Sequence, residues 1–196
     1  MDLHKLLNLP YSNKDLLKNL DLLKSDQLII QDKKTTLLGL DLIKEELTHF
    51  PKEYISNCSL ILEDQTKIKD LSESEFHFIG PKKILSLENT GLFVVPNIYS
   101  THEISLNLSN NSLLNISNLP PRINSLFLDG NPYLRKLSAL PELNSLVIDL
   151  QLVPELIRLN PVIRSDIRLK YRDQFLEFKS LEQIKRWFSR NKIITF

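Results

Sequence analysis

The chain has 196 residues, of which 42% are hydrophobic and 25% are charged. This balance is typical of a soluble protein that forms a core, and it argues against disorder. The 25 Lys and Arg residues nearly cancel the 24 Asp and Glu residues, so the overall charge does not indicate a nucleic-acid or membrane binder. The single cysteine, Cys58, excludes an internal disulfide and a cysteine-rich metal site.

The first 19 residues are expected to form a helical cap. Ser12-Asn-Lys-Asp15 is followed by Leu16, Leu17 and Leu20, as in an N-capped amphipathic helix. This segment lacks the apolar run of a secretory signal, and no stretch approaches the roughly 20 apolar residues of a membrane span. The expected location is therefore cytoplasmic, and no membrane span is predicted.

From residue 20 onward, a Leu-x-Leu step recurs about every twenty residues. Each step predicts a short strand whose alternate side chains face inward and outward, and stacked neighbours would share one core. The successive spacings are 20, 20, 25, 21, 20, 20 and 21 residues, and the first residues of the steps are Leu20, Leu40, Leu60, Leu85, Leu106, Leu126, Leu146 and Ile167.

The repeat has a sequence pattern as well as a period. Ile123-Asn-Ser-Leu126-Phe-Leu128-Asp-Gly-Asn131 follows the pattern L-x-x-L-x-L-x-x-N, so the chain resembles the leucine-rich repeat proteins. The period and the phrase Leu140-Pro-x-Leu143-x-x-Leu146 are most similar to the short repeats of bacterial secreted effectors. This resemblance implies an α/β leucine-rich-repeat solenoid of about eight repeats over residues 20–175. It also implies an interaction module, of which an effector delivered into a host cell is one form.

The expected solenoid has a curved parallel sheet on its concave side and extended or 3₁₀ returns on its convex side. In the family, an Asn five residues after the first strand Leu satisfies backbone groups of the turn. Here it is Asn only at Asn111 and Asn131; Thr90 can partly replace it, whereas Glu45 and Arg172 weaken their repeats. The long repeat between residues 60 and 85 is expected to contain an insertion or bulged loop at residues 72–80.

Residues 176–196 are expected to form a helical C-terminal cap, completing one continuous domain. Ser180-Leu-Glu-Gln183 has the pattern of a capping box. Leu181, Ile184 and Phe188 would share one face of the helix, with Trp187 beside them. Residues 151–196 carry ten Lys or Arg and five Asp or Glu, a net charge of +5, against −4 for the rest of the chain.

The sequence predicts no catalytic site, no metal and no cofactor, and hence a protein that is not an enzyme. His4, His49, His77 and His102 are isolated in sequence and form no metal-ligand spacing. An enzyme that uses Cys58 or a His–carboxylate pair assembled by the fold is the minor alternative. We expect Cys58 to be structural, because free cysteines are most often buried.

The predicted function is binding of a partner protein on the concave sheet. The partner would have a basic and partly apolar surface, because outward-facing carboxylates alternate with apolar side chains. The predicted partner-binding residues are Ile61, Glu63, Glu88, Phe127, Asp129, Val147 and Asp149. A solvated face without a partner is the other interpretation of this pattern.

The basic C-terminal end supports an alternative function, which is binding of nucleic acid or an anionic surface. Interleaved aromatic residues would favour it, although a solvated cap helix explains the same residues. The candidate residues are Arg168, Lys170, Arg172, Lys185, Arg186 and Arg190.

Overall fold

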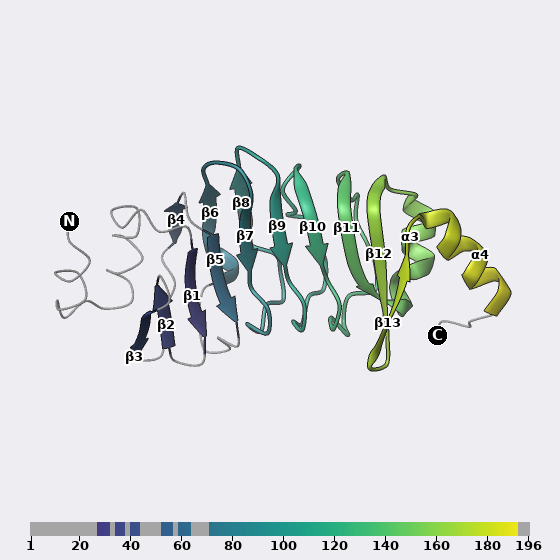
Figure 1. Ribbon diagram of the computed structural model, residues 1–196, viewed down its shortest axis with the longest axis horizontal. Coiled ribbons are helices and arrows are strands. Elements are labelled where there is room, and N and C mark those ends of the chain that lie inside the picture. Colours follow the sequence, from purple (N-terminus) through teal and green to yellow (C-terminus); the bar gives the residue numbers. More distant parts are fainter. Residues whose placement is uncertain are drawn as a thin grey trace.

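A computed structural model shows two β-sheets and short helices arranged along one axis (Figure 1). The structure describes residues 27–31, 34–37, 40–43, 52–56, 59–63 and 71–191. The larger sheet has ten strands in the order β13-β12-β11-β10-β9-β7-β5-β1-β2-β3. These strands are β1 (Gln27–Gln31), β2 (Lys34–Leu37), β3 (Leu40–Ile43), β5 (Ser59–Glu63), β7 (Lys83–Ser86), β9 (Ile104–Asn107), β10 (Ile123–Phe127), β11 (Leu143–Asp149), β12 (Ile163–Tyr171) and β13 (Gln174–Phe178).

The twenty-residue period produces parallel strands in the middle of this sheet. Leu106 of β9 lies in register with Leu126 of β10, and Leu126 lies in register with Leu146 of β11. The same register continues to Ile167 in β12 and, in the other direction, to Leu85 and Leu60. The strands predicted at these six Leu-x-Leu steps are therefore confirmed.

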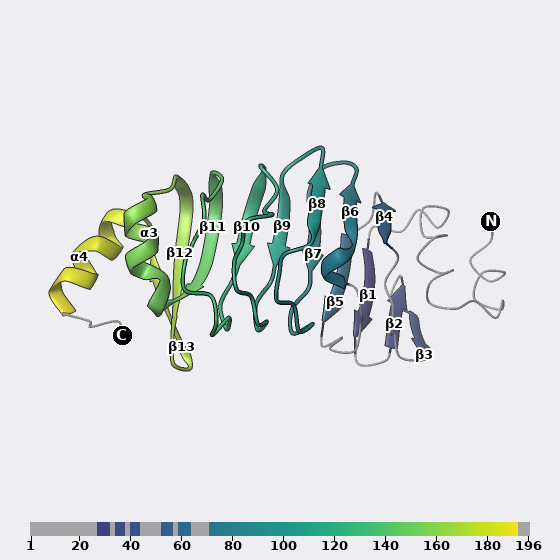
Figure 2. The same ribbon diagram turned by 180° about the vertical axis from the view of Figure 1, so that it is seen from behind.

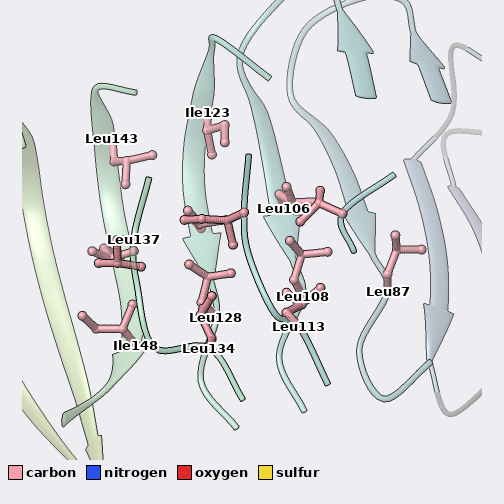
Figure 3. Close-up of a cluster of buried hydrophobic side chains, with 14 of the residues drawn as sticks. Leu87, Leu106, Leu108, Leu113, Ile123, Leu128, Leu134, Leu137, Leu143 and Ile148 are labelled. Carbon is pink, nitrogen blue, oxygen red and sulfur yellow. The ribbon is translucent and has the colours of Figure 1, made fainter. Parts of the chain in front are cut away.

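The leucines of these strands form one continuous core. Both apolar residues of a step, such as Leu106 and Leu108, are completely buried. Figure 3 shows them meeting side chains from the return segments, including Leu113, Leu134 and Leu137. Burial of a leucine side chain contributes about 1.5–3 kcal/mol, so the stacked repeats supply most of the driving force for folding.

A second sheet lies in the return segments. It has three parallel strands in the order β4 (Glu53–Ser56), β6 (Glu75–Phe78) and β8 (Asn97–Ser100). In Figure 1, β6 and β8 run opposite to β5, β7 and β9. The inward side chains of this sheet, Tyr54, Phe76, Phe78 and Ile98, join the core of the larger sheet. The next return segment contains Pro120 and Pro121, which cannot donate ladder hydrogen bonds, so the sheet ends at β8.

The helices lie at the core side and at the C-terminal end. These elements are the 3₁₀ helices η2 (Leu71–Glu73) and η3 (Leu150–Leu152), and the α-helices α3 (Val153–Leu159) and α4 (Leu181–Asn191). Figures 1 and 2 place η2 and α3 on the same side of the ten-stranded sheet, the side that also carries the core. None of the helices in the described part of the chain is long and apolar enough to cross a membrane.

The expected fold class was wrong. The structure is a mixed α/β arrangement of two sheets, not a leucine-rich-repeat solenoid with one curved, parallel sheet between helical caps. The pairs β1–β2, β2–β3 and β12–β13 are antiparallel, so both ends of the large sheet leave the parallel pattern. The residues predicted as an insertion or bulged loop, 72–80, instead include strand β6, which pairs with β4 and β8 in a second sheet, and this return also contains the 3₁₀ helix η2.

The expected helical caps are also corrected. The N-terminal cap, residues 1–19, lies outside the described residues. At the other end, the predicted helix is present as α4, and Ser180 Oγ accepts a hydrogen bond from the Gln183 N–H at 3.3 Å. However, strand β13 forms the last edge of the sheet and crosses the predicted boundary at residue 176. A β-hairpin therefore ends the sheet, because β12 finds its final backbone partner in the segment that directly follows it.

Candidate partner-binding face

The candidate site is the outer face of the ten-stranded sheet, defined here as the face opposite the core. In Figures 1 and 2, η2, α3 and the three-stranded sheet lie on the core side, and α4 lies beyond the C-terminal end of the sheet. A row of outward side chains in register crosses the outer face, and we call it the central row. It consists of Ile61, Ser86, Asn107, Phe127, Val147, Arg168 and Glu177.

The centre of this row is an aromatic ring beside a cation. The Arg168 guanidinium carbon lies 5.8 Å from the centroid of the partly exposed Phe127 ring, a distance at which a cation and a ring attract. Val147 lies between them in register and is only 2% exposed. Phe127 and Arg168 therefore present a contact surface, whereas Val147, predicted as an apolar anchor, has almost no surface left to offer.

Arg168 has unused hydrogen-bonding capacity. Its Nε atom is buried and has no hydrogen-bond partner among the described residues. The Asp166 carboxylate lies 3.8 Å away from this atom, which is beyond hydrogen-bonding distance. Nε is therefore a buried donor that pairs only electrostatically with a carboxylate among the described residues.

A second row lies at the carboxyl ends of the strands, and we call it the carboxylate row. Asp129, predicted to guide a partner, is only 6% exposed. It accepts hydrogen bonds from Ser109 Oγ at 2.7 Å and from Lys170 Nζ at 3.0 Å. An unpaired charge in this position would be costly, so the Asp129 carboxylate depends on both partners, and removing either of them would destabilise the fold. The row consists of Glu88, Ser109, Asp129, Asp149 and Lys170.

The other two carboxylates of the row also hold turns in place. Asp149 Oδ2 accepts hydrogen bonds from the backbone N–H groups of Gly130 at 3.0 Å and Asn131 at 3.3 Å. Glu88 accepts from the side-chain amides of Asn107 at 2.9 Å and Asn110 at 2.8 Å. Both carboxylates remain partly exposed, so they combine a structural role with a negative surface charge.

Buried asparagines fix the turns that follow β9 and β10. Asn131 Nδ2 donates to the carbonyls of Leu108 at 3.0 Å and Leu128 at 2.8 Å, and Oδ1 accepts from the N–H of Leu113 at 3.1 Å. Asn111 makes the equivalent contacts one repeat earlier. The role expected for these two residues is confirmed, and it holds the carboxylate row in position.

The remaining predicted partner-binding residues lie toward the N-terminal end of the sheet. Ile61 is partly exposed on β5 and belongs to the central row. Glu63 is the last residue of β5, and its side chain lies outside the described residues. Cys58, His4 and His49 lie outside the described part of the chain.

The six predicted basic residues lie in three places, which are strand β12, the β12–β13 turn and helix α4. Arg168 and Lys170 project from β12 toward Asp166 and Asp129, and Arg172 lies at the β12–β13 turn over the Tyr171 ring. On α4, Lys185 bonds to Glu182 at 2.7 Å. Most of these cations therefore already contact a carboxylate or an aromatic ring. The exposed members are Arg172 on the hairpin and Arg186 and Arg190 on α4.

Two hollows on the outer side of the protein were missed by the sequence analysis. One, of about 330 Å³, lies at the carboxyl ends of the strands and is bordered by Asp149, Lys170 and Arg172. The other, of about 600 Å³, lies at the amino ends of β7, β9 and β10 beside Ile84. The alternation of inward and outward residues along β7 places Ile84 on the outer face, and this was the feature of the sequence that could have indicated the second hollow. The loops that shape each hollow come from separate repeats, so no local pattern predicts them.

The description of the site is completed by its capacity to hold a metal ion and by the comparison of the chain with known proteins. Within residues 27–31, 34–37, 40–43, 52–56, 59–63 and 71–191, no group of three or more His, Cys, Asp or Glu side chains is placed to hold a metal ion. The chain matches no protein-family model, no curated protein and no solved structure.

Proposed function

We propose that this protein binds a partner protein on the outer face of its ten-stranded sheet and is not an enzyme. The observation that carries the proposal is the outer face of a largely parallel sheet, over which none of the described helices or other strands lies. Parallel sheets are normally covered on both faces, since their strands bury side chains on each side. Here η2, α3 and the second sheet lie on the core side, and α4 lies beyond the C-terminal end of the sheet (Figure 2). A partner would supply the missing layer.

The centre of the binding surface is the pair formed by Phe127 and Arg168. Aromatic and arginine side chains are enriched among the residues that dominate the energetics of protein interfaces, because aromatic rings bury a large area and the planar guanidinium combines stacking with several hydrogen bonds. The two side chains already contact each other before binding, so less conformational entropy is lost in the complex.

The charge of the surface favours a basic, partly apolar partner. Around Phe127, the carboxylates of the two rows and Asp166 outnumber the cations. Five acids against two bases give this surface a net charge of −3. Such a field speeds association with a cationic surface and orients it. The acids are Glu88, Asp129, Asp149, Asp166 and Glu177, and the bases are Arg168 and Lys170.

The test is an affinity capture from lysate with the wild-type chain and with Phe127→Arg. This substitution removes the aromatic contact and adds a positive charge where a basic partner would bind. The matched control is Phe93→Arg, because Phe93 is 59% exposed and lies outside both sheets. Asp129 is not substituted, since a change at this buried carboxylate would unfold the protein rather than report on binding.

We expect proteins that the wild type and Phe93→Arg capture and that Phe127→Arg loses. Their capture should weaken at high salt, which screens exposed charges, and should resist nuclease. Identical captures by all three chains would contradict the proposal. Captures that survive Phe127→Arg but vanish with nuclease would instead favour nucleic-acid binding through Arg186 and Arg190.

A further inference from the structure

The cavity of about 600 Å³ on the outer face has the size of a binding site. Pockets that hold ligands or side chains have volumes of roughly 300–1,000 Å³. It opens at the amino ends of β7, β9 and β10, on the same face as Phe127. The lining groups that carry the argument are Lys82, Ile84, His102, Glu103, Ser105 and Asn124.

The floor of the cavity is apolar and fixed. Ile84 is 42% exposed, although it points outward from the middle of a strand. Its N–H donates a hydrogen bond to Ser59 Oγ at 3.0 Å, which ties the strand to its neighbour at this residue. Covering such an isoleucine with an aliphatic group would remove apolar surface from water on both sides of the contact.

The rim of the cavity is built from two loops that are bonded to each other. The Gly80 N–H donates to Thr101 Oγ1 at 3.4 Å, and the Thr101 N–H donates to the Phe78 carbonyl at 3.3 Å. Thr101 Oγ1 also lies 2.9 Å from His102 Nδ1. Lys82 has a left-handed φ of 55° in the first loop. The cavity is therefore shaped before any ligand binds, which lowers the entropic cost of binding.

Ser105 lines one wall of the cavity, and Ser125 lies next to it in register on β10, just outside the lining. Asn144 Nδ2 donates to Asn124 Oδ1 at 2.6 Å, and Asn124 Nδ2 donates to Ser105 Oγ at 3.3 Å and to Ser125 Oγ at 3.2 Å. Because both serine oxygens accept from Asn124, their protons must turn elsewhere, and the described residues offer no acceptor for them. A row of such donors fits the carbonyl groups of an extended peptide.

We infer that this cavity takes an aliphatic side chain from an extended peptide segment of the partner, whose carbonyls accept hydrogen bonds from Ser105 and Ser125. Lys82 and Glu103 on the rim have opposite charges, so the cavity is close to neutral and fits an uncharged side chain rather than an anion or a cation. This inference rests on the proposed function, and it adds a second anchor to the Phe127 surface.

The experiment selects peptides from a phage-displayed library of random linear sequences on the immobilised full-length protein. Enriched peptides are then synthesised and titrated against three variants. Ile84→Arg fills the cavity with a charged side chain. Ile55→Arg is the matched control, because Ile55 is 48% exposed on the other sheet. The double variant Ser105→Ala/Ser125→Ala removes the donors and keeps the cavity, and thermal unfolding confirms that each chain folds.

We expect enriched peptides that share an aliphatic residue. Their affinity should fall by about tenfold or more in Ile84→Arg, fall several-fold in the serine double variant and stay unchanged in Ile55→Arg. Peptides that bind Ile84→Arg as tightly as they bind the wild type would overturn the inference. A selection that enriches no peptides on the wild type relative to Ile84→Arg would also overturn it. Partner capture that depends on Phe127 but not on Ile84 would overturn it while leaving the proposed function intact.

Discussion

Two regions of the large sheet have the same strands but different turns. In the central region, the turns after β9 and β10 each contain a buried asparagine, Asn111 or Asn131. In the C-terminal region, the same sequence position holds Gln151 after β11 and Arg172 after β12. The strands of both regions continue in one parallel register, with Leu126, Leu146 and Ile167 side by side.

The comparison shows how a turn can replace a missing side-chain amide. Where Asn131 is present, its amide pairs three backbone groups, and the chain returns without regular structure. Where Gln151 stands, the chain enters η3 and α3, which pair their own backbone groups. Where Arg172 stands, with a φ of 56°, the chain makes a hairpin and pairs with β12. The need to satisfy buried backbone groups is the same in each case.

The largest effect is expected when this amide is removed from the central region. Asn131→Ala leaves two carbonyls and one N–H without their partner, and each buried unpaired group costs about 1–3 kcal/mol. We expect the free energy of unfolding to fall by about 3–5 kcal/mol, measured by urea denaturation. Gln151→Ala is the control, with an expected loss within about 0.5 kcal/mol. Equal losses of unfolding free energy in the two variants would contradict the conclusion that the buried asparagine holds the central turns.

An intermediate effect is expected at two glycines that close central turns. Gly91 and Gly130 both have positive φ, at 76° and 72°. A Cβ at Gly91 would meet nothing within 4 Å, whereas one at Gly130 would lie 2.2 Å from Asn110 Oδ1. We expect Gly91→Ala to cost about 1–2 kcal/mol in unfolding free energy from backbone strain alone.

Gly130→Ala should cost about 1 kcal/mol more, because Asn110 must move away from its hydrogen bond with Glu88. The difference in unfolding free energy between the two variants, again from urea denaturation, measures how much the Asn110–Glu88 hydrogen bond contributes to the carboxylate row. If the two losses are equal, the Asn110–Glu88 contact does not stabilise the turn.

The smallest effect is expected from the surface ion pair of α3, in the region that lacks the asparagine. Arg158 donates a hydrogen bond to Glu155 and holds the pKa of that carboxyl below its usual value of 4.5. A carboxyl with a lowered native pKa stabilises the fold above its unfolded pKa, and this contribution is lost as the pH falls through the lowered value.

In Arg158→Met, the melting temperature should therefore fall less between about pH 6 and pH 3 than in the wild type. The control is Arg122→Met, since the Arg122 guanidinium makes no ion pair within the described residues. A steeper acid dependence in Arg158→Met would contradict the assigned role of the pair.

Sequence periodicity predicted the parallel strands because each one depends on local alternation. Leu106 and Leu108 face the core in any arrangement that buries one side of their strand. The same alternation was present in Glu75-Phe76-His77-Phe78, where the even positions are buried. That segment was nevertheless interpreted as an insertion, because the repeat between residues 60 and 85 is longer than its neighbours; in the structure the segment pairs with β4 and β8 instead.

Strand alternation indicated which side chains leave the core, but not how far they are exposed. Alternation correctly placed Phe127 and Asp129 on the outer side of their strand region, yet Asp129 is buried by Ser109 and Lys170 from two other strands. Val147 is likewise covered in its row. Exposure depends on neighbours across the sheet, and a single strand contains no information about their size.

The sequence by itself determined the strand period, the inward leucines and the two buried asparagines, because each of these follows from contacts repeated at one fixed spacing. Tertiary structure decided the antiparallel ends, the second sheet and the cavity beside Ile84. These features arise where the repeat is imperfect. There the backbone groups must find partners, and only the three-dimensional arrangement of neighbouring segments specifies which partners lie within reach.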